Sequence, residues 1–306
     1  MLIEVRNAVR KFGNKSAVDD ISLKIAPGER LGILGPNGSG KTTLIQLILG
    51  FLKLTSGTID IDGQPVWPNR FAVRHRIGSL IEIPLLYPSL SARDNLLFFA
   101  RLTRLDLGKV DQLLETVHLD PAEKKPFSTF SLGMKQRLGI AVALVHDPKL
   151  IILDEPSNGL DPQGIADMRN LVIRLSRDRG KTILVSSHLL SEVELMANRM
   201  LILHKGKKVV EGLVSELLDP SRSVVHVETD NDEAIRTKLL QTKWSRFLQP
   251  GGNGIQLAMS KHEVPALVSD LVGMGAGIRR VDPAHSLEDY FLSLTTQPGH
   301  VDAAAN

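Results

Sequence analysis

The sequence predicts an α/β fold with parallel strands at its core, and three segments support this prediction. Residues 31–34 and 150–153 are short continuous apolar runs, which are typical of strands buried in a parallel sheet. Residues 43–49 carry apolar side chains at helical spacing, and Gly50 can close that helix. Buried strands alternating with amphipathic helices are the pattern expected of an α/β core.

A glycine-rich loop joins the first of these strands to the helix. Residues 35–42 read Gly-Pro-Asn-Gly-Ser-Gly-Lys-Thr, a complete phosphate-binding motif between a strand and a helix. In such a loop the backbone N–H groups and the helix N-terminus face phosphate oxygens. Lys41 is expected to reach the β- and γ-phosphates, and the Thr42 hydroxyl is expected to ligate Mg²⁺. The sequence therefore predicts a nucleoside triphosphate site formed by Gly35, Asn37, Gly38, Ser39, Gly40, Lys41, Thr42 and Thr43.

Two acids follow the second apolar run, at positions Asp154 and Glu155. Ligands of open α/β sheets bind at the carboxyl ends of the strands, so both acids should emerge near the phosphate loop. Asp154 is then placed to hold Mg²⁺, and Glu155 to orient or deprotonate the water that attacks the γ-phosphate. Taken alone, acids at a strand end can also be helix caps. Their pairing with the upstream loop favours the metal and base roles.

Composition limits the classes to which the chain can belong. Its 306 residues are 42% hydrophobic and 23% charged, as in ordinary globular proteins of one large or two smaller domains. No apolar run approaches the roughly 18 residues that cross a bilayer, and residues 1–6 resemble a strand and not a signal peptide. Zero cysteines favour a cytoplasmic location, and a net charge of +3 is too small to indicate nucleic-acid binding.

Further motifs resemble those of the ATP-binding-cassette (ABC) ATPases over roughly residues 2–212. Residues 130–137, Phe-Ser-Leu-Gly-Met-Lys-Gln-Arg, resemble the family's signature sequence. Residues 157–161 resemble its dimer-contact loop, which ends here at Asp161. Residues 182–188 look like the strand that ends in the family's switch histidine, here His188, and Phe12 matches the aromatic residue that stacks on adenine, usually a tyrosine. The resemblance implies a P-loop NTPase core with an α-helical signature subdomain.

The resemblance also implies a mechanism. Two copies of such a domain face each other head to tail around two ATP molecules. Each ATP then lies on the Lys41 loop of one copy and is capped by Ser131 and Gly133 of the other, with ATP and Mg²⁺ as the cofactors. A single copy should bind ATP and hydrolyse it poorly.

Two positions depart from the family pattern. Leu132 replaces the first of two central glycines in the signature, so contact with nucleotide is expected to run through Ser131 and the backbone near Gly133. Glu82 replaces the usual glutamine of a loop that touches Mg²⁺ and links the site to the membrane subunit. A carboxylate there offers the ion a harder ligand, so Glu82 joins Thr42 and Asp154 as an expected metal ligand.

The segment around Glu82 resembles one branch of the family. Residues 77–84, 87–91 and 94–96, with the signature, are similar to the bacitracin-resistance and lantibiotic-immunity ATPases. That branch implies export of drugs or peptide antibiotics, a separate integral membrane permease as partner and a peripheral location on the cytoplasmic face of a bacterial membrane. The alternative is a soluble ABC ATPase of translation or DNA maintenance. Those proteins typically carry two cassettes or a long inserted coiled coil, and neither pattern is found in this sequence.

The chain is expected to divide into a cassette over residues 1–219, with a helical subdomain at about 88–147, and an accessory α+β domain over 220–296. Within the helical subdomain, helices are expected over 91–104 and 109–118. Residues 85–87 with Phe98 and Phe99 could form a groove for a helix of the permease or belong to the core, and the core is favoured for Phe98. The accessory domain should have the ferredoxin-like order βαββαβ. Its expected elements are 223–227, 232–240, 244–248, 255–259, 264–272 and 277–281, and residues 297–306 are expected to form a flexible tail.

Overall fold

The computed structural model describes residues 1–81, 84–103, 106–217, 223–249 and 254–285. The chain divides into two compact units, Met1–Leu213 and Val214–Asn306, and each is described by itself. The expected boundary after residue 219 and the expected tail at 297–306 both lie outside the described residues.

A mostly parallel sheet forms the centre of the first unit, as predicted for an α/β core. Its strands are β3 (Arg30–Leu34), β6 (Ile77–Ile81), β7 (Leu150–Asp154), β8 (Thr182–Ser187), β9 (Arg199–His204) and β10 (Lys207–Leu213), in the order β10-β9-β3-β8-β7-β6. Only β10 is antiparallel to its neighbour among these strands. All residues of β7 and β8 are buried, which explains the continuous apolar runs at 150–153 and 183–185 within them.

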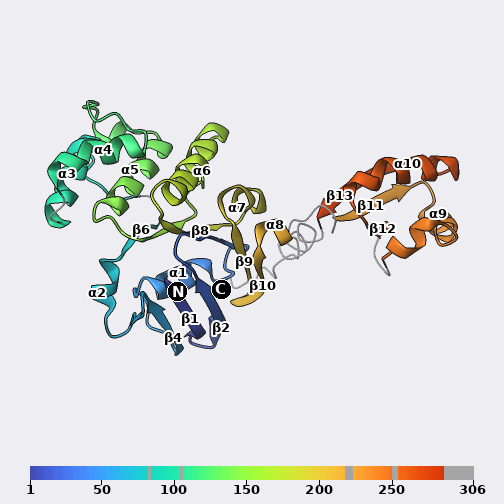
Figure 1. Ribbon diagram of the computed structural model, residues 1–306, viewed down its shortest axis with the longest axis horizontal. Coiled ribbons are helices and arrows are strands. Elements are labelled where there is room, and N and C mark those ends of the chain that lie inside the picture. Colours follow the sequence, from blue (N-terminus) through green and yellow to red (C-terminus); the bar gives the residue numbers. More distant parts are fainter. Residues whose placement is uncertain (82–83, 104–105, 218–222, 250–253, 286–306) are drawn as a thin grey trace, which may run out of the picture. The chain divides into compact units, whose positions relative to one another are not determined.

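An antiparallel sheet lies against one side of this core (Figure 1). It contains β1 (Ile3–Phe12), β2 (Lys15–Ile25), β4 (Ser56–Ile61) and β5 (Gln64–Pro65) in the order β2-β1-β4-β5. Helix α1 (Lys41–Ile48) contributes four buried apolar side chains, Leu44, Ile45, Leu47 and Ile48, to the hydrophobic cluster shared by both sheets. These side chains therefore anchor the helix that follows the phosphate loop in the hydrophobic core.

Helices pack on the other side of the parallel sheet and beyond its β6 edge (Figure 1). They are α3 (Ala92–Thr103), α4 (Val110–Thr116), α5 (Leu132–Leu144), α6 (Pro162–Arg177) and α7 (Leu190–Met196), with short 3-10 turns η1 (Leu107–Lys109) and η2 (Phe127–Thr129). Helix α2 (Arg70–Arg74) instead packs its buried Val73 into the cluster shared with the antiparallel sheet. Helices α3, α4 and α5 share one apolar cluster with α6 and the sheet. None of the described helices is long and apolar enough to span a membrane.

The prediction that Phe98 lies in the helical core is wrong. Helix α3 turns Ala92, Leu96 and Ala100 inward, and Phe98 lies on its flank with 37% of its surface exposed. There its ring makes an edge-on contact with Tyr87, with ring centroids 4.9 Å apart. The side of α3 that carries Phe98 is thus an aromatic surface.

The described part of the second unit contains a small antiparallel sheet and three α-helices. Its elements are α8 (Val214–Leu217), β11 (Ser223–Thr229), α9 (Asp232–Leu239), η4 (Lys243–Phe247), β12 (Ile255–Ala258), η5 (Lys261–Glu263), α10 (Val264–Gly273) and β13 (Ile278–His285). The described strands pair in the order β12-β11-β13. Val225, Leu239, Trp244, Leu257 and Leu267 are among the residues that form its core.

The second strand predicted for this unit, at residues 244–248, is wrong. Residues Lys243–Phe247 form a 3-10 turn in which Thr242 accepts the N–H of Trp244 at 3.2 Å, and the indole is buried. Leu248 keeps a single antiparallel bridge to Leu257. In the described residues the ferredoxin-like arrangement is therefore reduced to three strands, because burial of the large indole favours a turn at this point.

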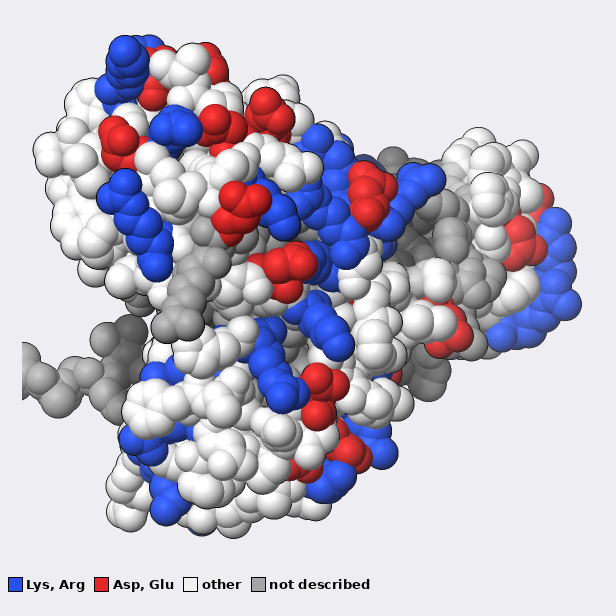
Figure 2. Space-filling view, turned by 60° about the vertical axis from the view of Figure 1, so that its left-hand side comes forward, with Lys and Arg blue, Asp and Glu red and all other residues white. Residues whose placement is uncertain are grey.

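The charged side chains do not separate into fields of one sign on the face drawn in Figure 2. Lysine and arginine side chains lie among aspartate and glutamate side chains over this face. Such interspersed charge favours solubility without creating a strong long-range field.

Candidate functional site

The phosphate loop ends at the N-terminus of α1, where glycine is required. Gly40 is the N-cap of the helix, with a φ of 108° and no side-chain cap, and an added Cβ would lie 2.4 Å from the carbonyl oxygen of Ala17. At Gly35 an added Cβ would lie 2.4 Å from the hydroxyl of Ser39. The first N–H groups of the helix thus lack a side-chain cap, and such groups favour an anion.

A surface hollow of about 330 Å³ lies over this loop. Phe12 stands at the hollow with 48% of its surface exposed, and its ring stacks on the guanidinium of Arg10 at 4.5 Å. The hollow is lined by Phe12, Lys15, Ala17, Asn37, Gly38, Ser39, Gly40, Lys41, Thr42, Thr43 and Glu155. An exposed aromatic ring beside a phosphate loop suits a nucleotide, because the ring can stack on a base while the loop holds phosphates.

Three ionisable side chains meet at this hollow, which two of them, Lys41 and Glu155, line. The ammonium of Lys41, 5% exposed, lies 3.2 Å from Oε1 of Glu155. It also donates to the carbonyl oxygen of Gly35 at 2.8 Å. The other carboxylate oxygen of Glu155, Oε2, lies 2.8 Å from Nδ1 of His188. Glu155 is therefore fixed between a cation that can bind phosphate and an imidazole.

Asp154 lies at the end of β7, beside Glu155, and is 7% exposed. Its Oδ1 accepts a hydrogen bond from the hydroxyl of Ser186 at the end of β8. Glu155 follows with a φ of 49°, an uncommon conformation for a residue other than glycine. We refer to Lys41, Asp154, Glu155 and His188 as the phosphate-loop site.

Ser131, Gly133 and Asp161 form a separate group, which we call the signature end. Ser131 caps α5 by accepting the N–H of Met134 at 3.3 Å, and Asp161 caps α6 by accepting the N–H of Gly164 at 2.9 Å. An added Cβ at Gly133 would lie 3.7 Å from the side chain of Leu160, so the starts of the two helices adjoin. None of these three residues lines the hollow over the phosphate loop.

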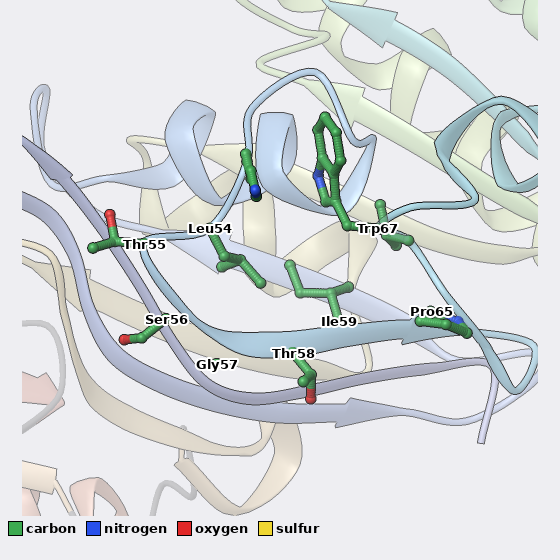
Figure 3. Close-up of a pocket in the computed structure, with 10 residues that line it drawn as sticks. Leu54, Thr55, Ser56, Gly57, Thr58, Ile59, Pro65 and Trp67 are labelled. Atoms are coloured by element: carbon green, nitrogen blue, oxygen red, sulfur yellow. The ribbon is translucent and has the colours of Figure 1, made fainter.

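Glu82, the expected third metal ligand, lies outside the described residues. A second hollow, of about 270 Å³, lies between β4 and Trp67 (Figure 3). Its walls include Leu54, Ile59 and Val66, and it contains none of the predicted site residues.

Sequence reasoning missed two residues near the site. Lys15 lines the hollow, and Ser186 bonds to Asp154. Asp154 and Ser186 are register partners in the parallel pairing of β7 with β8. Two serines before the predicted switch histidine were the only signal in the sequence, and the strand register was needed to use it.

Comparison with known proteins agrees with this geometry. A family model described as "ABC transporter" matches residues 18–158. The chain is 40% identical over 297 residues to YhcH of Bacillus subtilis (strain 168), named an uncharacterized ABC transporter ATP-binding protein, and the match covers 96% of each chain. This chain belongs to the ABC transporter ATP-binding proteins. The family predicted from the motifs is confirmed.

Two further relatives indicate the branch of the ABC family to which the chain is similar. The bacitracin transport ATP-binding protein BcrA of Bacillus licheniformis is 42% identical over 236 residues, which cover 76% of this chain and 77% of BcrA. The lantibiotic transport ATP-binding protein SrtF of Streptococcus pyogenes is 40% identical over 210 residues, covering 69% of this chain and 90% of SrtF. These relatives support the branch indicated by the segment around Glu82.

A solved ABC cassette has the same fold. MJ0796, as a dimer in a post-hydrolysis state with ADP and Pi, matches with a TM-score of 0.62 and 25% identity over 69% of this chain and 98% of that one. The chain is accordingly an ATP-binding and ATP-hydrolysing subunit of an ABC transporter. The transport names of its relatives favour this function over a soluble ATPase of translation or DNA maintenance.

Proposed function

We propose that two copies of this chain enclose two ATP molecules and that hydrolysis drives a separate membrane permease. The observation that carries this proposal is the separation of the phosphate-loop site from the signature end within one chain. Each is half of a site, and a head-to-tail pair would bring the halves together across the nucleotide. The dimeric form of MJ0796 supports the pairing of two such chains.

In this proposal each residue of the phosphate-loop site has a distinct task. Lys41 neutralises the β- and γ-phosphates, and Phe12 stacks on the adenine. Glu155 orients and deprotonates the attacking water, and His188 holds Glu155 through the bond at 2.8 Å. The partner copy adds Ser131, Gly133 and Asp161, with the N-terminal dipole of α5 directed at the γ-phosphate.

Magnesium is the metal that this family implies, and the oxygen donors of the site fit it. Asp154 offers a buried carboxylate of which Oδ1 is held by Ser186, and Thr42 offers an exposed hydroxyl. Hard oxygen donors of this kind, completed by phosphates and waters, are what Mg²⁺ prefers. When bound, the ion would neutralise charge that develops on the phosphates.

The permease is proposed to contact the aromatic side of α3. Leu85 is 98% exposed, and Tyr87, Phe98 and Leu102 are also exposed. Asn95, fully buried, holds this surface by bonding to the N–H of Tyr87 at 2.9 Å. An exposed apolar surface on a rigid support can bind a helix of a membrane subunit. The chain would then be peripheral, at the cytoplasmic face of a bacterial membrane.

The substrates are proposed to be peptide antibiotics, exported from the membrane. This class follows from the relatives named for bacitracin and lantibiotic transport. The second unit, which we propose as an accessory domain, would support the dimer or the permease contact. Its buried side chains are almost all apolar, with Thr229 the one buried polar side chain among its described residues.

The Glu155→Gln variant tests the proposed dimer. Loss of the base should leave ATP bound and unhydrolysed, so the pair should accumulate with Mg-ATP. Light scattering should give twice the monomer mass at saturating Mg-ATP and the monomer mass without nucleotide. A variant that binds ATP and stays monomeric would contradict the enclosed-ATP arrangement.

Purification of the tagged chain from its native membranes tests the transport partner. A membrane protein without a cassette should be recovered with it, and recovery should fall for a Tyr87→Ala, Phe98→Ala double variant that still binds ATP. Equal recovery with both proteins would contradict the proposed contact surface.

A further inference from the structure

A buried serine hydroxyl joins the two strand ends that carry the site. Ser186 is fully buried at the end of β8, in register with Asp154 at the end of β7. Its Oγ donates to Oδ1 of Asp154 at 2.5 Å and accepts the backbone N–H of Glu155 at 2.9 Å. One side chain thus contacts two consecutive residues of the phosphate-loop site.

These two bonds fix different properties of the site. A hydroxyl has one proton to donate, and here that proton is directed to Oδ1 of Asp154. The bond restrains rotation of the carboxylate and leaves Oδ2 to face a cation. The bond from the N–H of Glu155 restrains a backbone whose φ of 49° is uncommon for glutamate. That backbone determines where the Glu155 carboxylate meets Lys41 and His188.

The next serine along the strand has a different set of contacts. The hydroxyl of Ser187 donates to Glu192 at 2.6 Å and accepts the N–H of Leu189 at 3.0 Å. Successive strand residues point to opposite faces, so only Ser186 turns toward Asp154. The contact is therefore a feature of one position and not of the serine pair as a whole.

We propose that Ser186 is a positioning residue that aims Asp154 at the metal and Glu155 at the attacking water. This inference rests on the proposed roles of Asp154 as a Mg²⁺ ligand and Glu155 as the base. Residues that orient metal ligands through such hydrogen bonds typically contribute about 10- to 100-fold to metal affinity or activity. Ser186 therefore acts on hydrolysis without touching the nucleotide.

The test compares Ser186→Ala with a matched control, Ser176→Ala, in the full chain. Ser176 is also a buried serine, and its hydroxyl bonds to the carbonyl oxygen of Gly28, away from the hollow. Four quantities are measured: the melting temperature, ATP affinity without metal, Mn²⁺ affinity by electron paramagnetic resonance with a non-hydrolysable ATP analogue, and kcat.

For Ser186→Ala we expect Mn²⁺ affinity and kcat each to fall about 10- to 100-fold. ATP affinity without metal should stay within about twofold, because Ser186 is not among the residues that line the hollow. Ser176→Ala should leave Mn²⁺ affinity and kcat unchanged. Ser186→Cys, which keeps the side-chain volume and weakens the donor, should give intermediate losses and replaces Ser186→Ala if that variant does not fold.

Two results would overturn the inference. A folded Ser186→Ala or Ser186→Cys variant with wild-type Mn²⁺ affinity and kcat would reduce Ser186 to a structural contact, even if its melting temperature were lower. If the wild-type chain with the ATP analogue bound no Mn²⁺, the proposed metal site itself would fail, and the role of Ser186 with it. The wild-type titration thus separates the two failures.

Discussion

The phosphate-loop site and the signature end both include the starts of helices, yet they differ in how their side chains are paired. At the phosphate-loop site Lys41 and His188 each pair with Glu155, and Ser186 holds Asp154. At the signature end Ser131 and Asp161 bond to the backbone of their own helices.

This difference indicates that the two regions have different roles. A set of charges already paired within one chain is preorganised for chemistry, because its groups need not move when substrate binds. An exposed serine at the start of α5 is arranged to meet something outside the chain. A substitution at the phosphate-loop site should therefore impair a single chain. A substitution at the signature end should impair ATP hydrolysis only in the assembled pair.

Glu155→Gln should produce the largest effect. The amide keeps the shape of Glu155 and removes its ability to take a proton from water, and general bases contribute about 10²–10⁴-fold to rate. We expect kcat for ATP hydrolysis to fall by that factor while ATP affinity stays near wild type, as measured by phosphate release and nucleotide fluorescence. A fall of less than tenfold would remove Glu155 from the role of base.

Lys41→Ala should weaken ATP binding itself. Lys41 is 5% exposed and bonded to Glu155, so its removal deletes a charge-assisted contact to phosphate and leaves a carboxylate facing the loop. Hydrogen bonds to charged groups contribute ~1.5–3 kcal/mol, which corresponds to about 10- to 100-fold in affinity. Isothermal titration with ATP measures this loss, and unchanged affinity would show that the backbone alone holds the phosphates.

Ser131→Ala should separate the two regions most sharply. Loss of the cap on α5 should lower the free energy of unfolding by about 1 kcal/mol. ATP affinity of the isolated chain should be unchanged, because Ser131 does not line the hollow, whereas hydrolysis at saturating Mg-ATP should fall. A drop in ATP affinity equal to that of Lys41→Ala would mean that both regions act on the same nucleotide within one chain.

The helix of the signature end should also confer a small pH dependence on stability. His146 follows α5, and its Nε2 lies 3.1 Å from the carbonyl oxygen of Ile77 at the start of β6. Burial lowers the pKa of His146 below its usual value of 6.5, so the folded state disfavours its protonation. Stability should therefore be complete above about pH 6.5 and decrease as the pH falls below it.

Thermal unfolding between about pH 5 and 7.5 checks this prediction, with His146→Gln as the comparison. The glutamine variant should lose part of the decline seen at acid pH, since it has no proton to bind. An identical decline in both proteins would assign the acid sensitivity to other groups.

The sequence was sufficient for the α/β core because its signals are local. The glycine loop, the apolar runs of β3 and β7 and the periodicity of α1 each depend on neighbouring residues. The motifs also single out Ser131 and Asp161, and the structure shows that these residues are the N-caps of α5 and α6.

The remaining features depend on tertiary contacts that sequence spacing does not reveal. The bond from Ser186 to Asp154 requires the register of β7 against β8. Burial of the Trp244 indole converts an expected strand into a turn, and Phe98 lies on the flank of α3 because smaller side chains fill its inner face. In each case packing decides between local conformations of similar energy.

Mixing two inactive variants tests most directly whether each site is built from two chains. One variant is Lys41→Ala, with an intact signature end, and the other is Ser131→Arg, with an intact phosphate loop. In a head-to-tail pair of the two, one site unites the intact halves, so the mixture should regain ATP hydrolysis well above the sum of the separate proteins. A mixture no more active than that sum, from folded variants that associate with Mg-ATP, would show that a single chain supplies the whole site.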